Sequence, residues 1–343
     1  MMRLPHFRFV SPRTVQEAAD ALASAQPGGA MLVAGGTDLL PNMKRRQQTP
    51  HTLVGLRRIA ELRTIANGGD LSIGAGVTLN EIVRDRRIAE QYPGLWQAAA
   101  HVATPPLRNM GTIGGNICLD TRCNYYDQNY EWRKAIDFCM KKEGETCWVA
   151  TSSPRCLAVS STDTAPALMS LDAEVTLVSA AATRAIPIAD LFQNDGIDYL
   201  TRRADEILTR VTLPRRDGWR STYWKLRRRG AFDFPVLSVA AALKFAADGT
   251  VESARLVLGA VASRPIASAK ASAFLAGQRL TDEVIAEAAR LAAEPARPMD
   301  NTDFSLVWRK RVTRDFVTYA LRELRGDDMS ARRRRYHGVL WLR

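Results

Sequence analysis

Apolar and polar positions alternate in two different ways along the first hundred residues. From 31 to 44 an apolar run leads into Gly35 and Gly36 and then into an amphipathic stretch, which predicts a strand, a tight turn and a helix. The same reasoning predicts strands at 52–56 and 71–77 and helices at 79–85 and 95–102. The N-terminal third is therefore expected to mix helices and strands.

The pattern resumes after a long irregular stretch. Residues 161–168 open with the capping sequence Ser-Thr-Asp-Thr and continue as a helix. Strands are predicted at 174–178, 206–213, 223–226, 236–245 and 254–261, with a hairpin at 248–249, and helices at 282–293 and 304–324. The fold class predicted is α+β, with an antiparallel sheet-and-helix domain at the C-terminal end.

A second glycine turn occupies residues 109–116, Asn-Met-Gly-Thr-Ile-Gly-Gly-Asn. Backbone N–H groups in such turns suit a pyrophosphate, and one diphosphate held between two backbone loops would use both turns. The chain has no G-x-x-x-x-G-K-[ST] phosphate loop and no G-x-G-x-x-G at a strand-to-helix junction, which disfavours a doubly wound nucleotide site. Turns that merely reverse the chain are the alternative.

All five cysteines lie within the 39 residues from Cys118 to Cys156. Intervals of four, fifteen, seven and eight residues separate them, so there is no C-x-x-C pair. An odd count without an export signal disfavours a disulfide framework and favours metal, cluster or redox chemistry. Structural zinc usually takes a tight knuckle, which Cys118 and Cys123 alone could supply, whereas four thiolates from one loop can hold an iron–sulfur cluster.

Aromatic side chains gather around these cysteines. Six of them fall in the 34 residues from Cys123 to Cys156, against 7% aromatic residues in the whole chain. A shell that excludes water protects the sulfides of a cluster and tunes its potential. The alternative is a small aromatic core with incidental thiols.

The amino-acid composition limits the classes of protein to which this chain can belong. With 46% hydrophobic and 24% charged residues over 343 positions, the chain is a folded protein of more than one domain. No apolar stretch approaches the roughly 18 residues that span a bilayer, and no signal peptide is recognised, so a cytoplasmic protein without membrane contact is expected. The dispersed histidines and the absence of G-x-S-x-G and H-E-x-x-H motifs predict no catalytic residue in this chain.

Basic residues exceed acidic ones by 48 to 36, a net charge of +12, with the excess concentrated in 215–229 and 309–343. Such a surface suits an acidic partner, because opposite charge raises the rate of encounter. Nucleic-acid binding is disfavoured, because the aromatic residues gather among the cysteines and do not alternate with the basic residues.

Four segments, LVAGGTDLLPNMK, MGTIGGNI, TDTAPAL and YWKLRRRGAFDFP, resemble in order and spacing the FAD-binding subunits and domains of the xanthine oxidase family of molybdenum hydroxylases. The resemblance covers nearly the whole chain. It implies FAD-binding subdomains at 1–57 and 58–220 and a C-terminal α+β domain at 221–328. A cysteine-rich insertion at 120–159 interrupts the second subdomain, and a basic tail at 329–343 does not match the family pattern.

The resemblance also implies site residues. Asp163 would accept hydrogen bonds from FAD hydroxyls, Lys225 would place a positive charge near the isoalloxazine, and Val102 and Leu208 would add apolar or backbone contacts. If the family resemblance is set aside, the sequence pattern alone predicts that Asp163 is a helix N-cap and that Lys225 is a surface lysine. The residues assigned to the FAD diphosphate and ribityl chain are Leu32, Val33, Ala34, Gly35, Gly36, Thr37, Asp38, Leu39, Gly111, Thr112, Ile113, Gly114, Gly115 and Asn116.

The insertion resembles that of the flavin subunits of 4-hydroxybenzoyl-CoA reductases, a branch of this family with an additional [4Fe–4S] cluster. The ligands implied are Cys123, Cys139, Cys147 and Cys156, which leaves Cys118 as a packed thiol. Loss of the cluster would leave the insertion as the fragile part of the chain.

The role implied is electron transfer. Reduced ferredoxin would supply electrons through the [4Fe–4S] cluster and FAD to a small subunit with two [2Fe–2S] clusters and a large subunit with the molybdenum cofactor, in a dimer of heterotrimers. The reaction served would be the reductive dehydroxylation of 4-hydroxybenzoyl-CoA to benzoyl-CoA. The alternative within the family is the flavin subunit of an aldehyde- or CO-oxidising enzyme, in which electrons run the opposite way and the thiols bind zinc or nothing.

Overall fold

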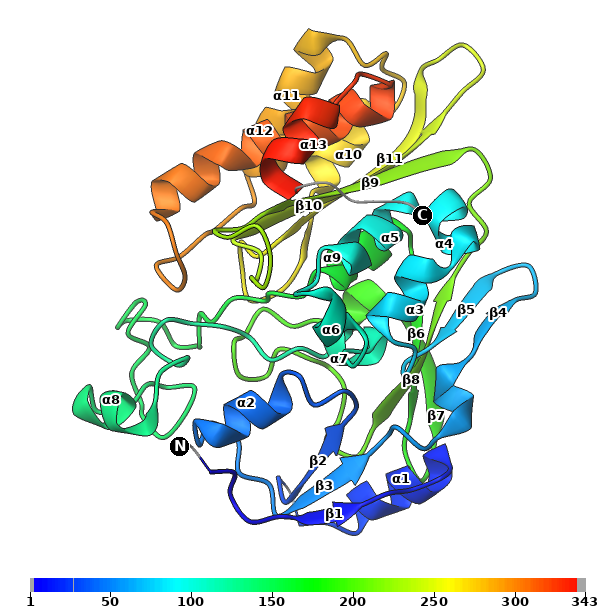
Figure 1. Cartoon of the computed structure of the whole chain (residues 1–343). Helices are drawn as coiled ribbons and strands as arrows, with labels where there is room; N and C mark the ends of the chain where they lie inside the picture. The colour runs from blue at the N-terminus through cyan, green and yellow to red at the C-terminus, as the bar shows by residue number, and fades with distance from the viewer. Residues whose placement is uncertain (1–2, 27, 338–343) are drawn as a thin grey trace.

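The computed structural model describes residues 3–26 and 28–337 and has the predicted α+β fold, with three sheets (Figure 1). The strands are β1 (Arg8–Val10), β2 (Ala30–Val33), β3 (Thr52–Gly55), β4 (Ile65–Asn67), β5 (Leu71–Gly74), β6 (Glu174–Val178), β7 (Thr183–Pro187), β8 (Ile207–Leu213), β9 (Trp219–Leu226), β10 (Leu237–Phe245), β11 (Val251–Gly259) and β12 (Ile266–Ala267). The helices are α1 (Val15–Ala23), α2 (Leu39–Lys44), α3 (Leu79–Arg84), α4 (Arg86–Gln91), α5 (Pro93–Ala100), α6 (Pro105–Arg108), α7 (Ile113–Ile117), α8 (Tyr130–Ala135), α9 (Thr164–Ser170), α10 (Ala269–Leu275), α11 (Asp282–Ala293), α12 (Leu306–Arg325) and α13 (Ser330–His337).

The N-terminal sheet is parallel and has the strand order β1-β3-β2. Helix α1 begins at Thr14, whose side chain accepts a hydrogen bond from the N–H of Glu17, and packs Leu22 against the buried Val54 of β3. Strand β2 lies at the edge of the sheet with all four residues only half-buried. The first glycine turn follows directly from this half-covered strand.

The second sheet has the order β4-β5-β8-β6-β7 and is antiparallel throughout. Its inner face, with Ile73 and Val211 fully buried, packs on Leu95 of α5 and Leu168 of α9. A capping box at Thr78 starts α3. This core supports the second glycine turn, which leads into α7.

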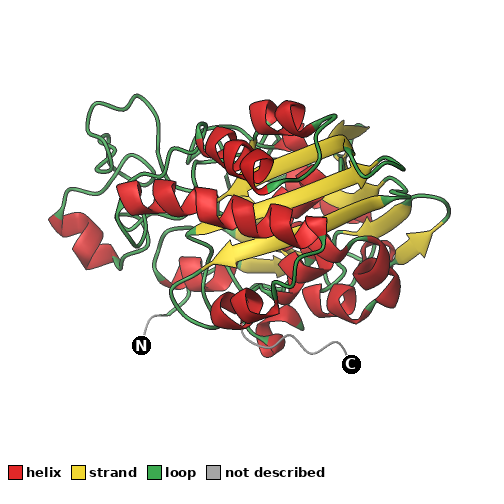
Figure 2. Cartoon of the chain, turned by 90° about the horizontal axis from the view of Figure 1, so that it is seen from above, coloured by secondary structure: helices red, strands yellow, loops and turns green. Residues whose placement is uncertain are grey.

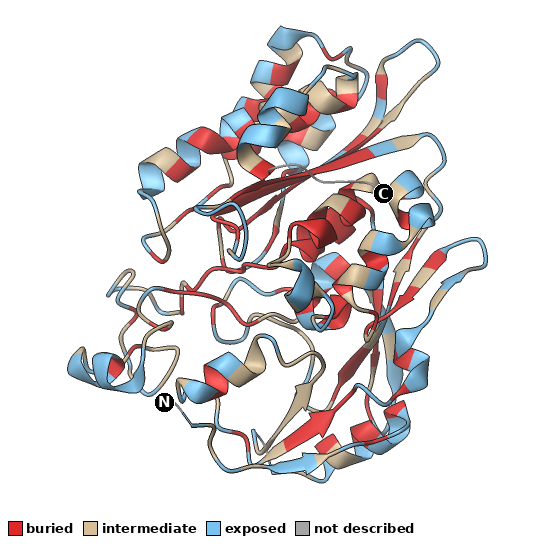
Figure 3. Cartoon of the chain, in the orientation of Figure 1, coloured by how far each residue is buried: buried red, intermediate tan, exposed pale blue. Residues whose placement is uncertain are grey.

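The C-terminal sheet, β12-β11-β10-β9, is antiparallel and lies between two helical layers. Helices α10, α11 and α12 cover its outer face, as seen from above in Figure 2. Helices α5 and α9 approach the other face through the small buried residues Ala98, Ala167 and Ala240 (Figure 3). Burial on both faces explains the nearly continuous apolar sequence of β10.

The basic tail that the family pattern does not place forms helix α13 as far as His337, and its last residues, 338–343, lie outside the described part of the chain. Arg333 lies 4.0 Å from the ring centroid of Trp224 and donates to Glu323 Oε1 at 2.9 Å. The tail therefore packs on the C-terminal sheet through its arginines. Within residues 3–26 and 28–337, no helix combines the length and apolar character needed to cross a membrane.

Candidate functional site

The two glycine turns touch each other. A Cβ added to Gly35 would overlap the carbonyl oxygen of Met110 and lie 3.0 Å from the backbone nitrogen of Gly111. Gly36 has φ of +69°, a conformation that strongly favours glycine. The turns thus form one continuous backbone surface, in which the N–H groups of Gly111, Ile113 and Gly114 already donate to the carbonyls of Leu107, Val77 and Ala75.

Side chains of the first turn point in different directions. Leu32, Val33 and Ala34 are half-buried along β2 and the loop that follows it, and Thr37 is exposed. Asp38 forms an ion pair with Arg122 of the insertion and accepts a hydrogen bond from Asn42 Nδ2 at 3.1 Å. The residues at this corner are Leu32, Val33, Ala34, Gly35, Gly36, Thr37, Asp38 and Leu39, the last of which opens α2.

The second turn is fixed to the start of α9. Asn116 Oδ1 accepts hydrogen bonds from Thr162 Oγ1 at 3.0 Å and from the N–H and hydroxyl of Thr164 at 3.0 and 2.7 Å. Asp163 occupies the N-cap position of α9, but its side chain makes no capping bond. Asp163 thus stands at the cap position, but the first turn of the helix is capped by Thr162, whose hydroxyl accepts from the N–H of Ala165, and by Asn116, which accepts from the N–H of Thr164.

Asp163 and Lys225 form a buried ion pair. Lys225 Nζ donates to Asp163 Oδ2 at 2.9 Å and to the carbonyl of His101 at 3.1 Å, and Tyr223 Oη donates to Asp163 Oδ1 at 2.7 Å. Burial raises the pKa of the Asp163 carboxyl and lowers the pKa of the Lys225 ammonium, and each partner's charge opposes the other's shift. Lys225 is completely buried, so the reading of it as a surface lysine is wrong.

The remaining predicted flavin contacts lie on the flanks. Val102 is half-buried just beyond α5, and its carbonyl accepts from Arg108 Nη1 at 2.9 Å. Leu208 is 4% exposed on β8, within the core of the second sheet. The backbone of Ala75 links that strand to the second turn, since its N–H donates to Thr209 and its carbonyl accepts from Gly114.

Four cysteines of the insertion line one cavity. Cys123, Cys139, Cys147 and Cys156 are each only 5–6% exposed, none is in a disulfide, and their cavity has a volume of about 10 Å³. The aromatic side chains of Tyr125, Tyr126 and Trp148 also line this cavity. Among the described residues no group of three or more His, Cys, Asp or Glu side chains is arranged to hold a metal ion. Cys118 lies apart, packed against the core of the second sheet.

Three of the thiols of this cavity, those of Cys123, Cys139 and Cys156, are held in the protonated form. Burial raises the pKa of Cys123 to about 12 and that of Cys156 to about 11, and it also raises the pKa of Cys139. Iron or zinc binds the thiolate, so either would have to displace these protons. Thiolates are the usual ligands of iron–sulfur clusters, so these four buried thiols are the candidate donors of the cavity.

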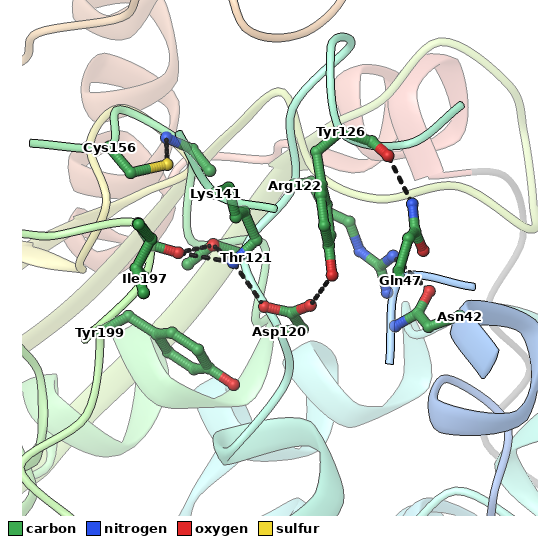
Figure 4. Close-up of polar contacts among 12 residues, drawn as sticks. Asn42, Gln47, Asp120, Thr121, Arg122, Tyr126, Lys141, Cys156, Ile197 and Tyr199 are labelled. Carbon is green, nitrogen blue, oxygen red and sulfur yellow. Dashed lines mark hydrogen bonds and ion pairs between the residues drawn. The ribbon is translucent and has the colours of Figure 1, made fainter. Parts of the chain in front are cut away.

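The insertion is closed at its base and held against the segment that follows α2 (Figure 4). Arg122 and Val159 exchange backbone hydrogen bonds of 2.8 and 2.7 Å where the insertion begins and ends. Lys141 Nζ donates to Asp120 Oδ1 at 2.8 Å, and Gln47 Nε2 donates to the carbonyl of Tyr126 at 2.5 Å. The insertion that carries the cysteine cavity is therefore anchored beside the first glycine turn, where Arg122 pairs with Asp38.

The sequence reasoning missed the charged residues of this network. Asp120, Arg122 and Lys141 are at most 8% exposed in their side chains, although charged residues of an insertion are expected at the surface. The one available signal was their position inside an aromatic-rich segment.

Fold and site together define a flavoprotein with two glycine turns, and comparisons place it among known proteins. Residues 5–216 match the FAD-binding domain of molybdopterin dehydrogenases, and residues 221–324 match the C-terminal domain of CO dehydrogenase flavoproteins. The chain belongs to the FAD-binding subunits of the molybdenum hydroxylase family. It is an oxidoreductase subunit of that family.

Relatives and solved structures agree with this assignment. The FAD-binding subunit of an aldehyde oxidoreductase from Escherichia coli K12 is 32% identical, over 88% of this chain and 95% of its own. The FAD subunit of a nicotinate dehydrogenase from Eubacterium barkeri is 27% identical, over 89% and 91%. Among solved structures, quinoline 2-oxidoreductase from Pseudomonas putida 86 aligns with a TM-score of 0.74 at 26% identity, over 94% of this chain and 98% of its own.

Proposed function

We propose that this chain is the electron-transfer subunit of an aldehyde-oxidising molybdenum hydroxylase and holds both FAD and a [4Fe–4S] cluster. The cavity lined by Cys123, Cys139, Cys147 and Cys156 carries the proposal for the cluster. The similarity to an aldehyde oxidoreductase subunit along nearly the whole chain supports the aldehyde as substrate class. This is the oxidising alternative of the sequence analysis, with the cysteines given a cluster in place of zinc or nothing.

The two cofactors supply complementary chemistry, because FAD exchanges electrons singly or in pairs whereas a cluster exchanges them one at a time. The chain's own part is to hold them close together. Leu32–Leu39 and Gly111–Asn116 would bind the FAD diphosphate through their backbone, and Asp163 and Lys225 would act at the flavin end of the site. The ion pair between Asp38 and Arg122 connects the first turn to the insertion.

The partners proposed are those of a heterotrimer. A large subunit would carry the molybdenum cofactor and bind the aldehyde, and a small subunit would carry two [2Fe–2S] clusters. Oxidation of the aldehyde with water gives a carboxylic acid, two protons and two electrons, and the electrons would leave one at a time to a ferredoxin-like carrier. A dimer of such heterotrimers and a cytoplasmic location complete the proposal.

The carrier is proposed to dock beside the insertion. A groove between the end of α11 and the start of α12 has Leu306 and Val307 in its wall and the exposed basic residues Lys310, Arg311 and Arg314 beside them. The segment joining these helices contacts the insertion, since Asn301 Nδ2 donates to the carbonyl of Leu157 at 2.6 Å and the Asn301 carbonyl accepts from Asn124. An acidic carrier fits this surface by charge.

A second candidate is 4-hydroxybenzoyl-CoA reductase. The observation that favours it is the cysteine-rich insertion, which resembles that of the reductase branch and contains the four cysteines that the resemblance implies as ligands. In this case electrons would enter from reduced ferredoxin, and two electrons and two protons would convert 4-hydroxybenzoyl-CoA into benzoyl-CoA and water.

One experiment separates the candidates. The chain would be purified anaerobically with its large and small partner subunits, and its flavin absorbance followed after addition of an aromatic aldehyde or, to the prereduced complex, of 4-hydroxybenzoyl-CoA. We expect the aldehyde to bleach the flavin and the acyl-CoA to leave the reduced flavin unchanged. Reoxidation by the acyl-CoA without bleaching by aldehydes would transfer the assignment to the reductase. A response to neither would refute both.

A further inference from the structure

We propose that Lys141 and Asp120 form an oriented charge pair that sets the reduction potential of the cluster, with Lys141 raising it and Asp120 lowering it. The inference rests on the proposed [4Fe–4S] site and concerns two residues outside the predicted ligand set.

Lys141 is a fixed cation at the wall of the cysteine cavity. Its side chain is 6% exposed and lines the cavity together with the four cysteines. Its ammonium donates to three acceptors, Asp120 Oδ1 at 2.8 Å, Thr121 Oγ1 at 2.8 Å and the carbonyl of Gly196 at 2.6 Å. Because an ammonium has three N–H donors, these bonds leave it no freedom to turn toward solvent.

Asp120 lies behind the lysine. It is 6% exposed in its side chain but is not among the residues that line the cavity. Its second oxygen accepts hydrogen bonds from Tyr126 Oη and Gln48 Nε2, both at 3.2 Å. The pair is therefore oriented, with its positive end at the cavity and its negative end directed away from it (Figure 4).

Orientation determines the electrostatic effect. Reduction adds one electron to the cluster, so a nearby fixed cation favours the reduced form and a nearby anion disfavours it. Both charges act in a buried environment where water and salt screen them weakly. The nearer charge dominates, and the intact pair is expected to raise the cluster potential relative to a cavity without it.

A purely structural role makes different predictions. The pair also ties the middle of the insertion to its first residue, and Lys141 ties it to the carbonyl of Gly196, so its loss could simply loosen the loop and release iron. Such a role would treat the removal of either partner alike. An electrostatic role gives opposite signs for the two removals, because each variant leaves the other charge behind.

The test is an anaerobic redox titration of the purified chain with dithionite, following the EPR signal of the reduced cluster and, in the same sample, the flavin absorbance. K141M and K141Q should shift the cluster midpoint to more negative potential, and D120N should shift it to more positive potential. K141R should lie near the unmodified protein, and K141M/D120N between the two single variants. K142M is the matched control, since the side chain of the neighbouring Lys142 is 29% exposed and, within residues 3–26 and 28–337, forms an ion pair only with Glu143.

The outcomes are distinct. Shifts of the same sign in K141M and D120N, or shifts no larger than that of K142M, would overturn the inference while leaving the cluster in place. Iron loss from K141M, K141Q and D120N alike would also overturn it and assign the pair to folding of the loop. An unmodified protein that contains FAD but no iron would refute the cluster itself, and the inference with it.

Discussion

At the scale of single residues, this chain places charges inside the protein and pairs them there. Lys225 and Asp163 are the extreme case, because both are buried and Tyr223 and His101 supply their remaining hydrogen bonds. A buried pair contributes little net stability, but the removal of one partner leaves an uncompensated charge. The pair therefore fixes the start of α9 relative to β9 rather than simply stabilising the fold.

Lys225→Met should lower the free energy of unfolding by about 3–5 kcal/mol, since Asp163 would stay buried with only Tyr223 as a donor. Urea denaturation at neutral pH measures this change. Lys244→Met on the adjacent strand is the control, because Lys244 is 36% exposed and its pair with Glu252 is worth at most about 1 kcal/mol. Equal losses in the two variants would contradict the assignment.

Gly35→Ala should abolish FAD binding while the chain stays folded. The added Cβ would overlap the Met110 carbonyl and force the two glycine turns apart. Flavin retained per chain after gel filtration is the measurement, and a loss of at least about tenfold, or about 1.4 kcal/mol, is expected. Gly68→Ala is the control, since an added Cβ meets no atom within 4 Å there. Full flavin content in Gly35→Ala would show that the turns do not share the cofactor.

At the scale of elements, helix α13 covers the edge strand β9. Arg333 Nη1 lies 3.1 Å from His337 Nδ1, and His337 Nε2 lies 2.9 Å from the carbonyl oxygen and 3.1 Å from the backbone nitrogen of Lys225. The ring of His101 lies 4.1 Å from that of His337. Burial, reinforced by neighbouring cations such as Arg333, lowers the pKa of both histidines well below the usual value.

The lowered pKa values of these histidines determine how the free energy of unfolding changes with pH. Below about pH 6.5 the unfolded chain takes up a proton on each of these histidines and the folded chain does not, so acid favours unfolding. The free energy of unfolding should fall as pH drops below about 6.5, by up to about 1.36 kcal/mol per pH unit for each histidine. His337→Asn should reduce this slope by about one histidine's share in urea denaturation between pH 5 and 7. An unaltered slope in His337→Asn would contradict this assignment.

Elements with strong periodicity were predictable, and elements held by distant partners were not. The helix predicted at 282–293 has the bounds of α11, and the strand predicted at 174–178 has those of β6. Helix α13 escaped prediction because its arginines have no apolar face and depend on Trp224 and Glu323 from other elements. The cap of α9 was predicted in part: Thr162 of the predicted capping sequence accepts from the N–H of Ala165, whereas Asn116 supplies a second acceptor from far along the chain. Local patterns carry no information about such contacts.

The parts of the site that were predictable are those in which a tight backbone turn requires glycine. The paired glycines of the two turns identified one surface before the structure placed Gly35 against Met110. The clustering of the cysteines indicated a shared site, and the four predicted ligands line one cavity. The charged network of Asp120, Arg122 and Lys141 was not predictable, because burial of a charge depends on partners that only the folded chain brings together.

At the scale of the whole molecule, part of the net charge of +12 lies on one surface of the protein. Lys310, Arg311 and Arg314 lie beside the groove that adjoins the insertion, and none of them forms an ion pair with another described residue. A charge-reversing K310E/R311E variant should slow electron transfer to an acidic ferredoxin about tenfold or more at low salt and much less at high salt. Stopped-flow kinetics with the whole complex measures the rate.

Arg86→Glu is the control for that experiment. Arg86 is 91% exposed in its side chain on α4, away from the start of α12 (Figure 1). It should change the rate by less than about twofold, because exposed charges beyond a Debye length act weakly. A rate independent of salt, or equal effects of the two variants, would contradict docking at the groove.

We propose that one chain holds FAD between its glycine turns and an iron–sulfur cluster between Cys123, Cys139, Cys147 and Cys156. Iron, sulfide, zinc and flavin analysis of anaerobically purified protein, beside its Cys139→Ala and Cys118→Ala variants, tests it most directly. The account predicts four irons, four sulfides and one FAD per chain, with iron lost in Cys139→Ala and retained in Cys118→Ala. FAD without iron in protein never exposed to oxygen, zinc in its place, or full iron in Cys139→Ala would contradict it.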